Sequence, residues 1–241
     1  MEISERQLRQ LARDVDEQHR DGMATMATDI AELHAETRSF RATDRRSFLR
    51  TAGIGAGALT IGGTALSITS LLPAGAQEEK ELTDGDIAAF AESVELAAVE
   101  AYKAAAGSGK LQPAVVEIGT MFAGHHQEHA GAFAGASGGK ATGKPNAKLL
   151  TAVGDQLKGA GDQAAILKIA YDLEEAAAAT YLFALGALKS EAALQLSASI
   201  LPVESQHAVV LGSALGKPAT EYVPPFQTSD KAVDPAQFPV A

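Results

Sequence analysis

The chain has 241 residues, of which 46% are hydrophobic and 5% aromatic, and it contains no tryptophan and no cysteine. Without cysteine there is no disulfide, no thiolate metal site and no cysteine nucleophile, so any metal ion would need imidazole and carboxylate ligands. From Gln77 onward eleven lysines face twenty acidic residues and no arginine, which excludes nucleic acid as a partner because phosphate binding needs clustered basic residues. Alanine and leucine dominate the apolar residues, and this favours packed helices over a β-sandwich.

Residues 1–42 read as a helix of mixed charge lying on a surface, to which the sequence assigns no function. Its His19 and His34 are expected to be solvated, because a single histidine on a polar helix usually faces water.

Residues 43–76 have the features of a targeting segment. Arg45 and Arg46 precede a Phe-Leu pair, no charged residue occurs from Thr51 to Gln77, and the stretch ends in Ala-Gly-Ala, a small-x-small cleavage pattern. This order resembles a twin-arginine signal peptide. An uncleaved membrane anchor, for which the run is long enough, and a buried helix are the alternatives.

The resemblance to a twin-arginine signal implies export of an already folded protein, often with its cofactor loaded. The export machinery would then be a partner, residues 1–42 would be a cytoplasmic leader of the precursor, and the protein would be periplasmic, in the cell wall or extracellular.

Residues 77–216 are predicted to form an all-α four-helix bundle, and the proline-rich residues 217–241 an extended tail along it. Thr83 or Asp84 can cap the first helix, Gly107 can end it, and Pro113 suits the first turn of the second. A glycine-rich connection with one short helix separates the second and third helices, which makes it the long crossover of the bundle. The four helices are expected at about 84–106, 112–133, 162–188 and 190–212.

The first and third helices repeat each other in their polar residues. Glu95 precedes Tyr102 by seven residues, and Glu174 precedes Tyr181 by the same spacing, with an offset of 79 between the two pairs. Other acidic residues on these helices, Glu92 among them, are expected on solvated faces. A repeat that keeps polar residues in phase while the apolar residues drift is informative, since biased composition would align the alanines instead.

The second and fourth helices repeat with an offset of 78. His129 falls on His207, and His126 falls on Glu204. Residues three apart project from one face of a helix, so each pair can point into the bundle.

Helices that face inward would bring together three carboxylates and three imidazoles, which are costly to bury without compensating charge. Bound divalent cations would supply that charge, and oxygen and nitrogen ligands suit iron, manganese or zinc. The predicted metal ligands are Glu95, His126, His129, Glu174, Glu204 and His207.

One Glu from each of two helices and a Glu-x-x-His from each of the other two resembles the ferritin-like di-iron carboxylate proteins. The resemblance covers about residues 83–216, and it implies iron as the first candidate metal. The resemblance implies a dinuclear centre. His126 stands where the family has Glu, so a different metal, an asymmetric pair or a single ion is the alternative. The residues expected to support the ligands are His125, Glu128, Tyr102 and Tyr181, with the tyrosines hydrogen-bonding the carboxylates. Gly124 and Pro202, just before the ligand pairs, would favour local distortion of the helices.

The leading hypothesis is therefore an exported ferritin-like metal-binding protein that carries out redox chemistry with dioxygen or peroxide, as a ferroxidase or a peroxidase- or catalase-like oxidoreductase. No separate acid–base catalyst is identifiable, and a homo-oligomer is compatible with the sequence, although a hollow storage shell is not expected. One alternative is a non-catalytic envelope or stress-related bundle with a degenerate site. Another is a metal-free bundle whose polar core residues pair with one another.

Overall fold

The computed structural model describes residues 3–37, 82–224 and 226–240. The chain divides into two units, and the first of them, residues 1–27 and 82–241, contains the helices discussed below except the last part of α1. The predicted targeting segment, residues 43–76, lies outside the described residues. No helix in the described ranges is both long enough and apolar enough to cross a membrane.

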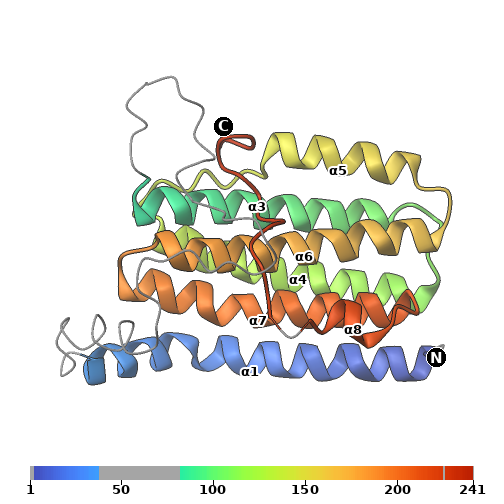
Figure 1. The fold of residues 1–241 in the computed structure, drawn as a ribbon, viewed down its shortest axis with the longest axis horizontal. Coiled ribbons are helices and arrows are strands. Elements are labelled where there is room, and N and C mark those ends of the chain that lie inside the picture. The colour runs from blue at the N-terminus through green and yellow to red at the C-terminus, as the bar shows by residue number, and fades with distance from the viewer. Residues whose placement is uncertain (1–2, 38–81, 225, 241) are drawn as a thin grey trace, which may run out of the picture. The chain divides into compact units, whose positions relative to one another are not determined.

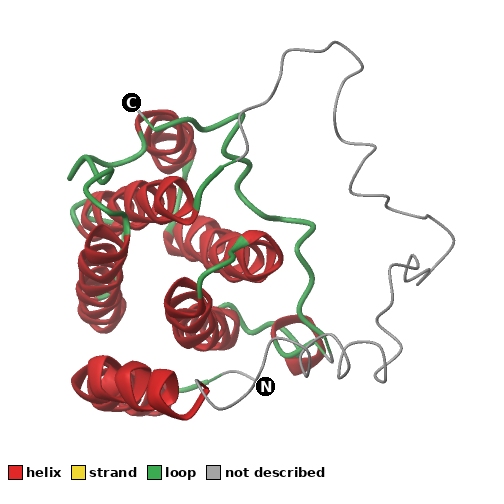
Figure 2. Ribbon diagram, turned by 90° about the vertical axis from the view of Figure 1, so that its left-hand side faces the viewer, coloured by secondary structure: helices red, strands yellow, loops and turns green. Residues whose placement is uncertain are grey.

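Four long helices form the bundle, and the described residues contain no strand, which confirms the predicted fold class. Helix α3 (Asp84–Ala106) pairs with α4 (Pro113–Ala136), and α6 (Gln163–Ala187) pairs with α7 (Glu191–Ala214). The two hairpins close on each other because α3 also contacts α6 and α4 contacts α7. Figure 1 shows that the helices of each hairpin run in opposite directions, and Figure 2 shows the helices closer to end-on.

The helices begin where the sequence offers capping groups. The Thr83 side chain accepts a hydrogen bond from the backbone N–H of Asp86, and the Asp86 carboxylate accepts one from the N–H of Thr83, which makes a capping box. Asp162 and Ser190 accept from the third residue of α6 and α7 in the same way, at 2.9 and 3.3 Å. Pro113 opens α4, where no N–H is needed.

The crossover between α4 and α6 contains a single helix, α5 (Ala147–Gly159), which lies against α3 and α6. Asn146 caps α5 by accepting from Leu149 N at 3.1 Å, and it donates to the carbonyl oxygen of Phe238 in the tail at 2.8 Å. This one side chain therefore links the crossover to the C-terminal tail, whose only regular element among the described residues is the one-turn helix α8 (Ala219–Tyr222).

Glu92 of α3 fixes the start of the crossover, and the expectation that it lies on a solvated face is wrong. Its side chain is buried, and its two oxygens accept hydrogen bonds from the backbone N–H groups of Thr142 and Gly143 at 3.1 and 3.0 Å. A carboxylate is stable there because two loop N–H groups replace its water.

Helix α1 (Glu5–Thr37) packs its first half on the bundle, which the expectation of a surface helix did not include. Leu8, Ala12 and Val15 are buried, and they belong to one apolar cluster with Ile118 and Phe122 of α4 and with residues of α7. The first half of α1 therefore covers the face that α4 and α7 present to it.

Candidate metal centre

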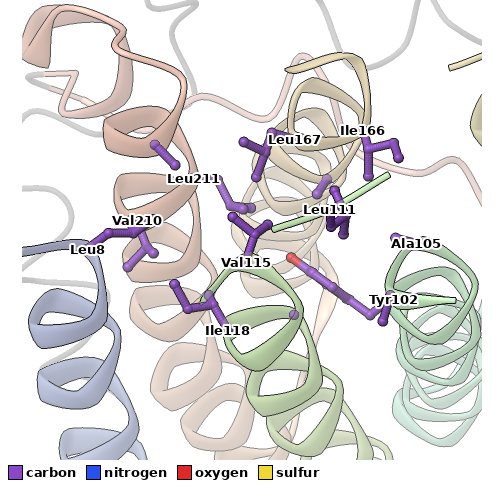
Figure 3. A pocket seen from close by; sticks show the side chains of 14 residues that line it. Leu8, Tyr102, Ala105, Leu111, Val115, Ile118, Ile166, Leu167, Val210 and Leu211 are labelled. Carbon is purple, nitrogen blue, oxygen red and sulfur yellow. The ribbon is translucent and has the colours of Figure 1, made fainter. Parts of the chain in front are cut away.

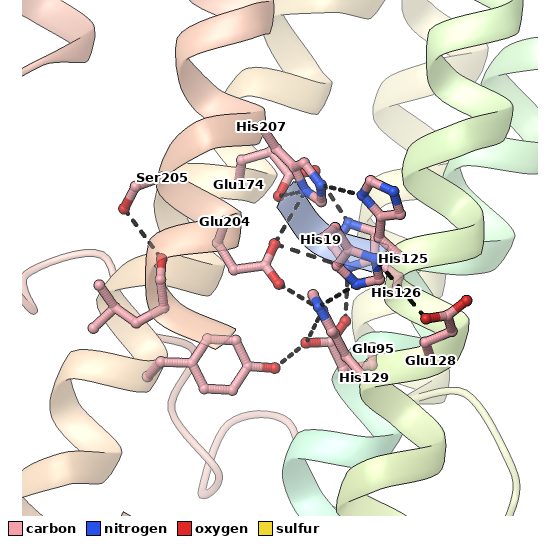
Figure 4. Close-up of polar contacts among 12 residues, drawn as sticks. His19, Glu95, His125, His126, Glu128, His129, Glu174, Glu204, Ser205 and His207 are labelled. Carbon is pink, nitrogen blue, oxygen red and sulfur yellow. Dashed lines mark hydrogen bonds and ion pairs between the residues drawn. The ribbon is translucent and has the colours of Figure 1, made fainter. Parts of the chain in front are cut away.

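Six ionisable side chains meet in the middle of the bundle (Figure 4). Each is at most 1% exposed, and each of the four long helices contributes at least one of them. The structure thus brings together every residue that the sequence predicts as a ligand: Glu95, His126, His129, Glu174, Glu204 and His207.

Helical spacing accounts for this convergence. His126 and His129 lie one turn apart on α4, and Glu204 and His207 lie one turn apart on α7, so each pair leaves its helix on the inward face. Both helices run without interruption through Gly124 and Pro202. The rings are also held by stacking, since Phe122 lies on His207 with 3.9 Å between ring centroids.

The donor atoms form two overlapping groups, and within each group one atom per residue lies within 4.8 Å of the others. His126 and Glu204 are shared by both groups. The first group is completed by Glu95 and His129, and the second by Glu174 and His207. The geometry therefore offers two adjacent positions for an ion.

His126 stands between the single glutamates of the two hairpins. Its Nδ1 lies 2.6 Å from Glu95 Oε2, and its Nε2 lies 3.1 Å from Glu174 Oε1. One ring nitrogen thus faces each of the two donor groups.

Glu204 differs from the other two carboxylates in its contacts. Its oxygens lie 2.9 Å from His129 Nδ1, 3.4 Å from His207 Nδ1 and 3.9 Å from His126 Nδ1. Neither oxygen, nor His129 Nδ1, makes a hydrogen bond to any described residue. Buried polar atoms nearly always make hydrogen bonds, so three buried atoms that make none and converge on one space suit a bound cation.

The electrostatics of the cluster favour charge on both kinds of group. Burial by itself would lower the pKa of His129, but the adjacent carboxylates of Glu204 and Glu95 outweigh it and raise that pKa to about 9. The pKa values of His126 and His207 are raised by the neighbouring carboxylates for the same reason. Conversely, burial opposes ionisation of Glu95, but the charge of His126 lowers its pKa to about 2.

Two tyrosines tie the hairpins together crosswise. Tyr102 of α3 donates its hydroxyl to Glu174 of α6, and Tyr181 of α6 donates its hydroxyl to Glu95 of α3. Burial, together with the carboxylate each contacts, raises the pKa of both phenols well above the ordinary value, so they remain donors. The hydrogen-bonding role expected for these tyrosines matches these contacts.

A second layer of polar contacts lies behind the histidines, on the side of α4, α7 and α1. His125 is buried, and its Nδ1 lies 2.9 Å from His207 Nε2. His19 of α1 is also buried, with its Nε2 3.2 Å from His129 Nε2, so the expectation that it is solvated is wrong. Glu128 is exposed, and its carboxylate lies 3.9 Å from His19 Nδ1. His34 lies in α1, but its side chain is outside the described residues.

Four helices that enclose three carboxylates and three imidazoles define the class of helical bundles with a carboxylate–imidazole centre. The sequence model of the ferritin-like domain family matches residues 83–217, which is more than half of the chain, so the chain belongs to that family. No curated protein and no solved structure matches the chain. The resemblance drawn from residues 83–216 is thereby confirmed at the level of the family.

Proposed function

We propose that the bundle is a metal-binding protein that holds one or two transition-metal ions at the six buried side chains. The observation that carries this proposal is that both oxygens of Glu204 are fully buried and make no hydrogen bond to a described residue, although imidazole nitrogens face them, the nearest at 2.9 Å. A carboxylate in that position gains more from a cation than from any group of the protein within reach.

The two overlapping donor groups support two ions that share Glu204, with neutral His126 as a ligand to one of them, or one ion in either group. Three carboxylates balance only three of the four charges on two divalent ions, so a second ion would bind more weakly than the first. Nitrogen and oxygen donors suit iron, manganese or zinc, and the resemblance to the di-iron carboxylate proteins makes iron the first candidate.

We further propose redox chemistry with dioxygen or peroxide, in the manner of a ferroxidase or of a peroxidase- or catalase-like oxidoreductase. A redox-active ion would supply the electron transfer. The protein would supply a dry environment and an approach for a small oxidant. A mostly apolar cavity of about 50 Å³ borders Glu95, His126 and Glu174 on the side of α5 and supports this role.

Export is the remaining part of the proposal. The order of features in residues 43–76 supports a twin-arginine route to the periplasm, the cell wall or the extracellular space.

The competing function is a metal-free bundle with no turnover, and one observation favours it. The raised pKa values of the three histidines let three imidazolium groups neutralise three carboxylates without any cation. Such buried ion pairs contribute little stability, so the metal-free form is expected to be weakly stable but folded.

Metal titration separates the two functions. The chelator-treated full-length chain is titrated with Fe²⁺, Mn²⁺ and Zn²⁺ under exclusion of oxygen, bound metal is measured by elemental analysis, and oxygen or peroxide is then added. His129→Ala and Glu204→Ala are expected to lose binding by 100-fold or more, whereas Glu100→Ala, which removes a surface partner of Lys103, keeps it. Equal binding by all four proteins would mean that the six buried side chains hold no metal, which favours the metal-free bundle. Metal binding without consumption of the oxidant would favour sequestration over catalysis.

A further inference from the structure

The first half of α1 carries a stripe of residues that faces the bundle. Leu8, Ala12, Val15 and His19 follow one another at intervals of four, three and four residues, which places them on one side of the helix. All four are buried. The apolar part of the stripe ends where the histidines of the candidate metal centre begin, so His19 is the member of the stripe that meets them.

Two hydrogen-bonded chains run outward from the ligand histidines. In one, His207 Nε2 lies 2.9 Å from His125 Nδ1, and His125 Nε2 lies 3.1 Å from Asp16 Oδ1 on α1. In the other, His129 Nε2 lies 3.2 Å from His19 Nε2 on α1, and the far nitrogen of His19 faces the Glu128 carboxylate at 3.9 Å. The first chain therefore ends at a carboxylate, and the second ends at His19, whose Nδ1 makes no hydrogen bond to a described residue. Each chain needs one residue of α1.

The first chain determines which nitrogen of His207 is free. A carboxylate can only accept, so His125 donates from Nε2 to Asp16, and neutral His125 then accepts at Nδ1 from His207 Nε2–H. In neutral His207, the form that binds a metal, the lone pair is therefore on Nδ1, which lies 3.3 and 3.4 Å from Glu174 and Glu204. A metal ligand needs that tautomer.

Polar contacts at the edge of the interface between α1 and the bundle hold α1 in this position. The Arg9 guanidinium forms an ion pair with Glu117 of α4, and Gln206 of α7 donates to the side-chain oxygen of Gln18 at 2.8 Å. Near the other end of the stripe, Leu8 forms part of the wall of an apolar cavity of about 30 Å³ that also touches Tyr102 (Figure 3). The α1 segment therefore contacts α4 and α7 along their apolar and polar parts alike.

We propose that residues 3–27 are a docked cover that completes the candidate metal centre, with Asp16 and His19 as positioning residues for His207 and His129. The inference rests on the proposed metal-binding function. The chain then has two forms of one site: a covered form with both hydrogen-bonded chains in place, and an uncovered form in which the outer nitrogens of His129 and His125 face solvent. A chain cut after Ala76, where the targeting segment ends, can pass from the first form to the second.

The first experiment compares the two forms with Co²⁺, whose visible absorption reports its ligands. The full-length chain is loaded with Co²⁺, and the rate at which a chelator removes the ion is measured. Val15→Asp, which places a charge in the apolar cluster that α1 forms with the bundle, is expected to speed removal at least tenfold and to shift the absorption bands. The same chain with a protease site inserted after Ala76, cut and separated from its N-terminal piece, is expected to behave like Val15→Asp.

The second experiment separates positioning from simple coverage. Asp16→Ala removes the acceptor of the first chain and is expected to change the Co²⁺ spectrum and speed release about tenfold. Asp16→Asn keeps an oxygen acceptor and should restore much of the native spectrum. Asp14→Ala is the matched control, since Asp14 is exposed on the same helix and pairs only with Gln10 among the described side chains.

The outcomes of these experiments separate the cover, the positioning role of Asp16 and the proposed metal-binding function. Unchanged release and spectrum in Val15→Asp, the cut chain and Asp16→Ala, with Co²⁺ bound in all, would overturn the cover while leaving the proposed function intact. An Asp14→Ala effect equal to that of Asp16→Ala would overturn the positioning role. No Co²⁺ bound by the native chain, whole or cut, would overturn the proposed function itself and the inference with it.

Discussion

His126 of α4 and Glu204 of α7 lie next to each other at the centre of the bundle, with 3.9 Å between Nδ1 and Oε2, although they occupy equivalent positions in the two hairpins. The two halves of the site are otherwise matched, with a Glu, a Tyr and a His from each. The asymmetry of the centre is therefore confined to one position, where one half supplies an imidazole and the other a carboxylate.

Replacing His126 with Glu tests what that asymmetry does. The variant would carry four buried carboxylates against two imidazoles, so its metal-free form is expected to lose about 3 kcal/mol of stability. Metal should recover this loss, because four carboxylates balance two divalent ions. Thermal unfolding with metal and with chelator is expected to show a wider difference in Tm than in the native chain. His126→Gln, which adds no charge, serves as the control, and an unchanged difference in Tm for His126→Glu would contradict the prediction.

The crosswise tyrosines make a second prediction. Tyr102→Phe and Tyr181→Phe each remove one hydroxyl from a glutamate of the centre, and each is expected to weaken metal binding about tenfold because the carboxylate loses its orienting donor. Competition with a coloured chelator measures the affinity. Tyr171→Phe is the matched control, since that hydroxyl donates to the carbonyl oxygen of Glu221 and does not reach the centre. Equal affinities in all three variants would show that the tyrosine contacts do not orient the ligands.

The stability of the metal-free chain is expected to be greatest near pH 6.5. Above it, His129 matters: its pKa in the fold is about 9 against 6.5 unfolded, so its contribution is full below pH 6.5 and is lost as the pH rises through 9. Below pH 6.5, His19 and His125 determine how the stability changes. Burial, followed by the charges of neighbouring imidazoles, lowers both pKa values to about 3, so their contributions are present above pH 6.5 and fall as the pH drops toward 3.

Urea unfolding at pH 5, 6.5 and 9 measures this dependence, and losses of about 2 kcal/mol are expected on each side. The metal-loaded protein is the control at the alkaline end, because ligation keeps the histidines deprotonated and removes the loss between pH 6.5 and 9. Stability that rose steadily from pH 5 to pH 9 without metal would be inconsistent with the ion pairs of the cluster.

Glu92 gives a prediction that does not depend on metal. Glu92→Ala leaves the N–H groups of Thr142 and Gly143 without their acceptor and is expected to cost about 1 to 3 kcal/mol in urea unfolding. Glu100→Ala on the same helix should stay within about 0.5 kcal/mol, because its partner Lys103 is exposed. A cost for Glu92→Ala no larger than that of Glu100→Ala would mean that the crossover is held by other contacts.

The bundle was predictable from local signals. Thr83, Pro113 and Ser190 mark three helix starts because capping and the first turn depend on the residues at hand and not on distant contacts. The long crossover followed from its glycines. The spatial convergence of the six polar residues was predictable for a different reason: they keep their register between the two halves while the surrounding alanines do not. Their role as metal ligands stays a prediction.

The contacts of α1 were not predicted, although part of the signal was present. The spacing of Leu8, Ala12, Val15 and His19 is that of an apolar stripe, but the many charges around it favoured the interpretation as a solvated helix. Which surface the stripe meets depends on the assembled bundle, and no local pattern contains that information. The role of Glu92 was equally hidden, because its partners are backbone N–H groups of a loop fifty residues away.

The tyrosine of each hairpin serves the glutamate of the other, so neither hairpin holds a complete centre by itself. Two identical hairpins could build such a centre as a symmetric pair, but every substitution in it would then occur twice. A single polypeptide that carries both halves is free of that restriction. It can exchange a carboxylate for an imidazole on one side alone, and position 126 is where this chain does so.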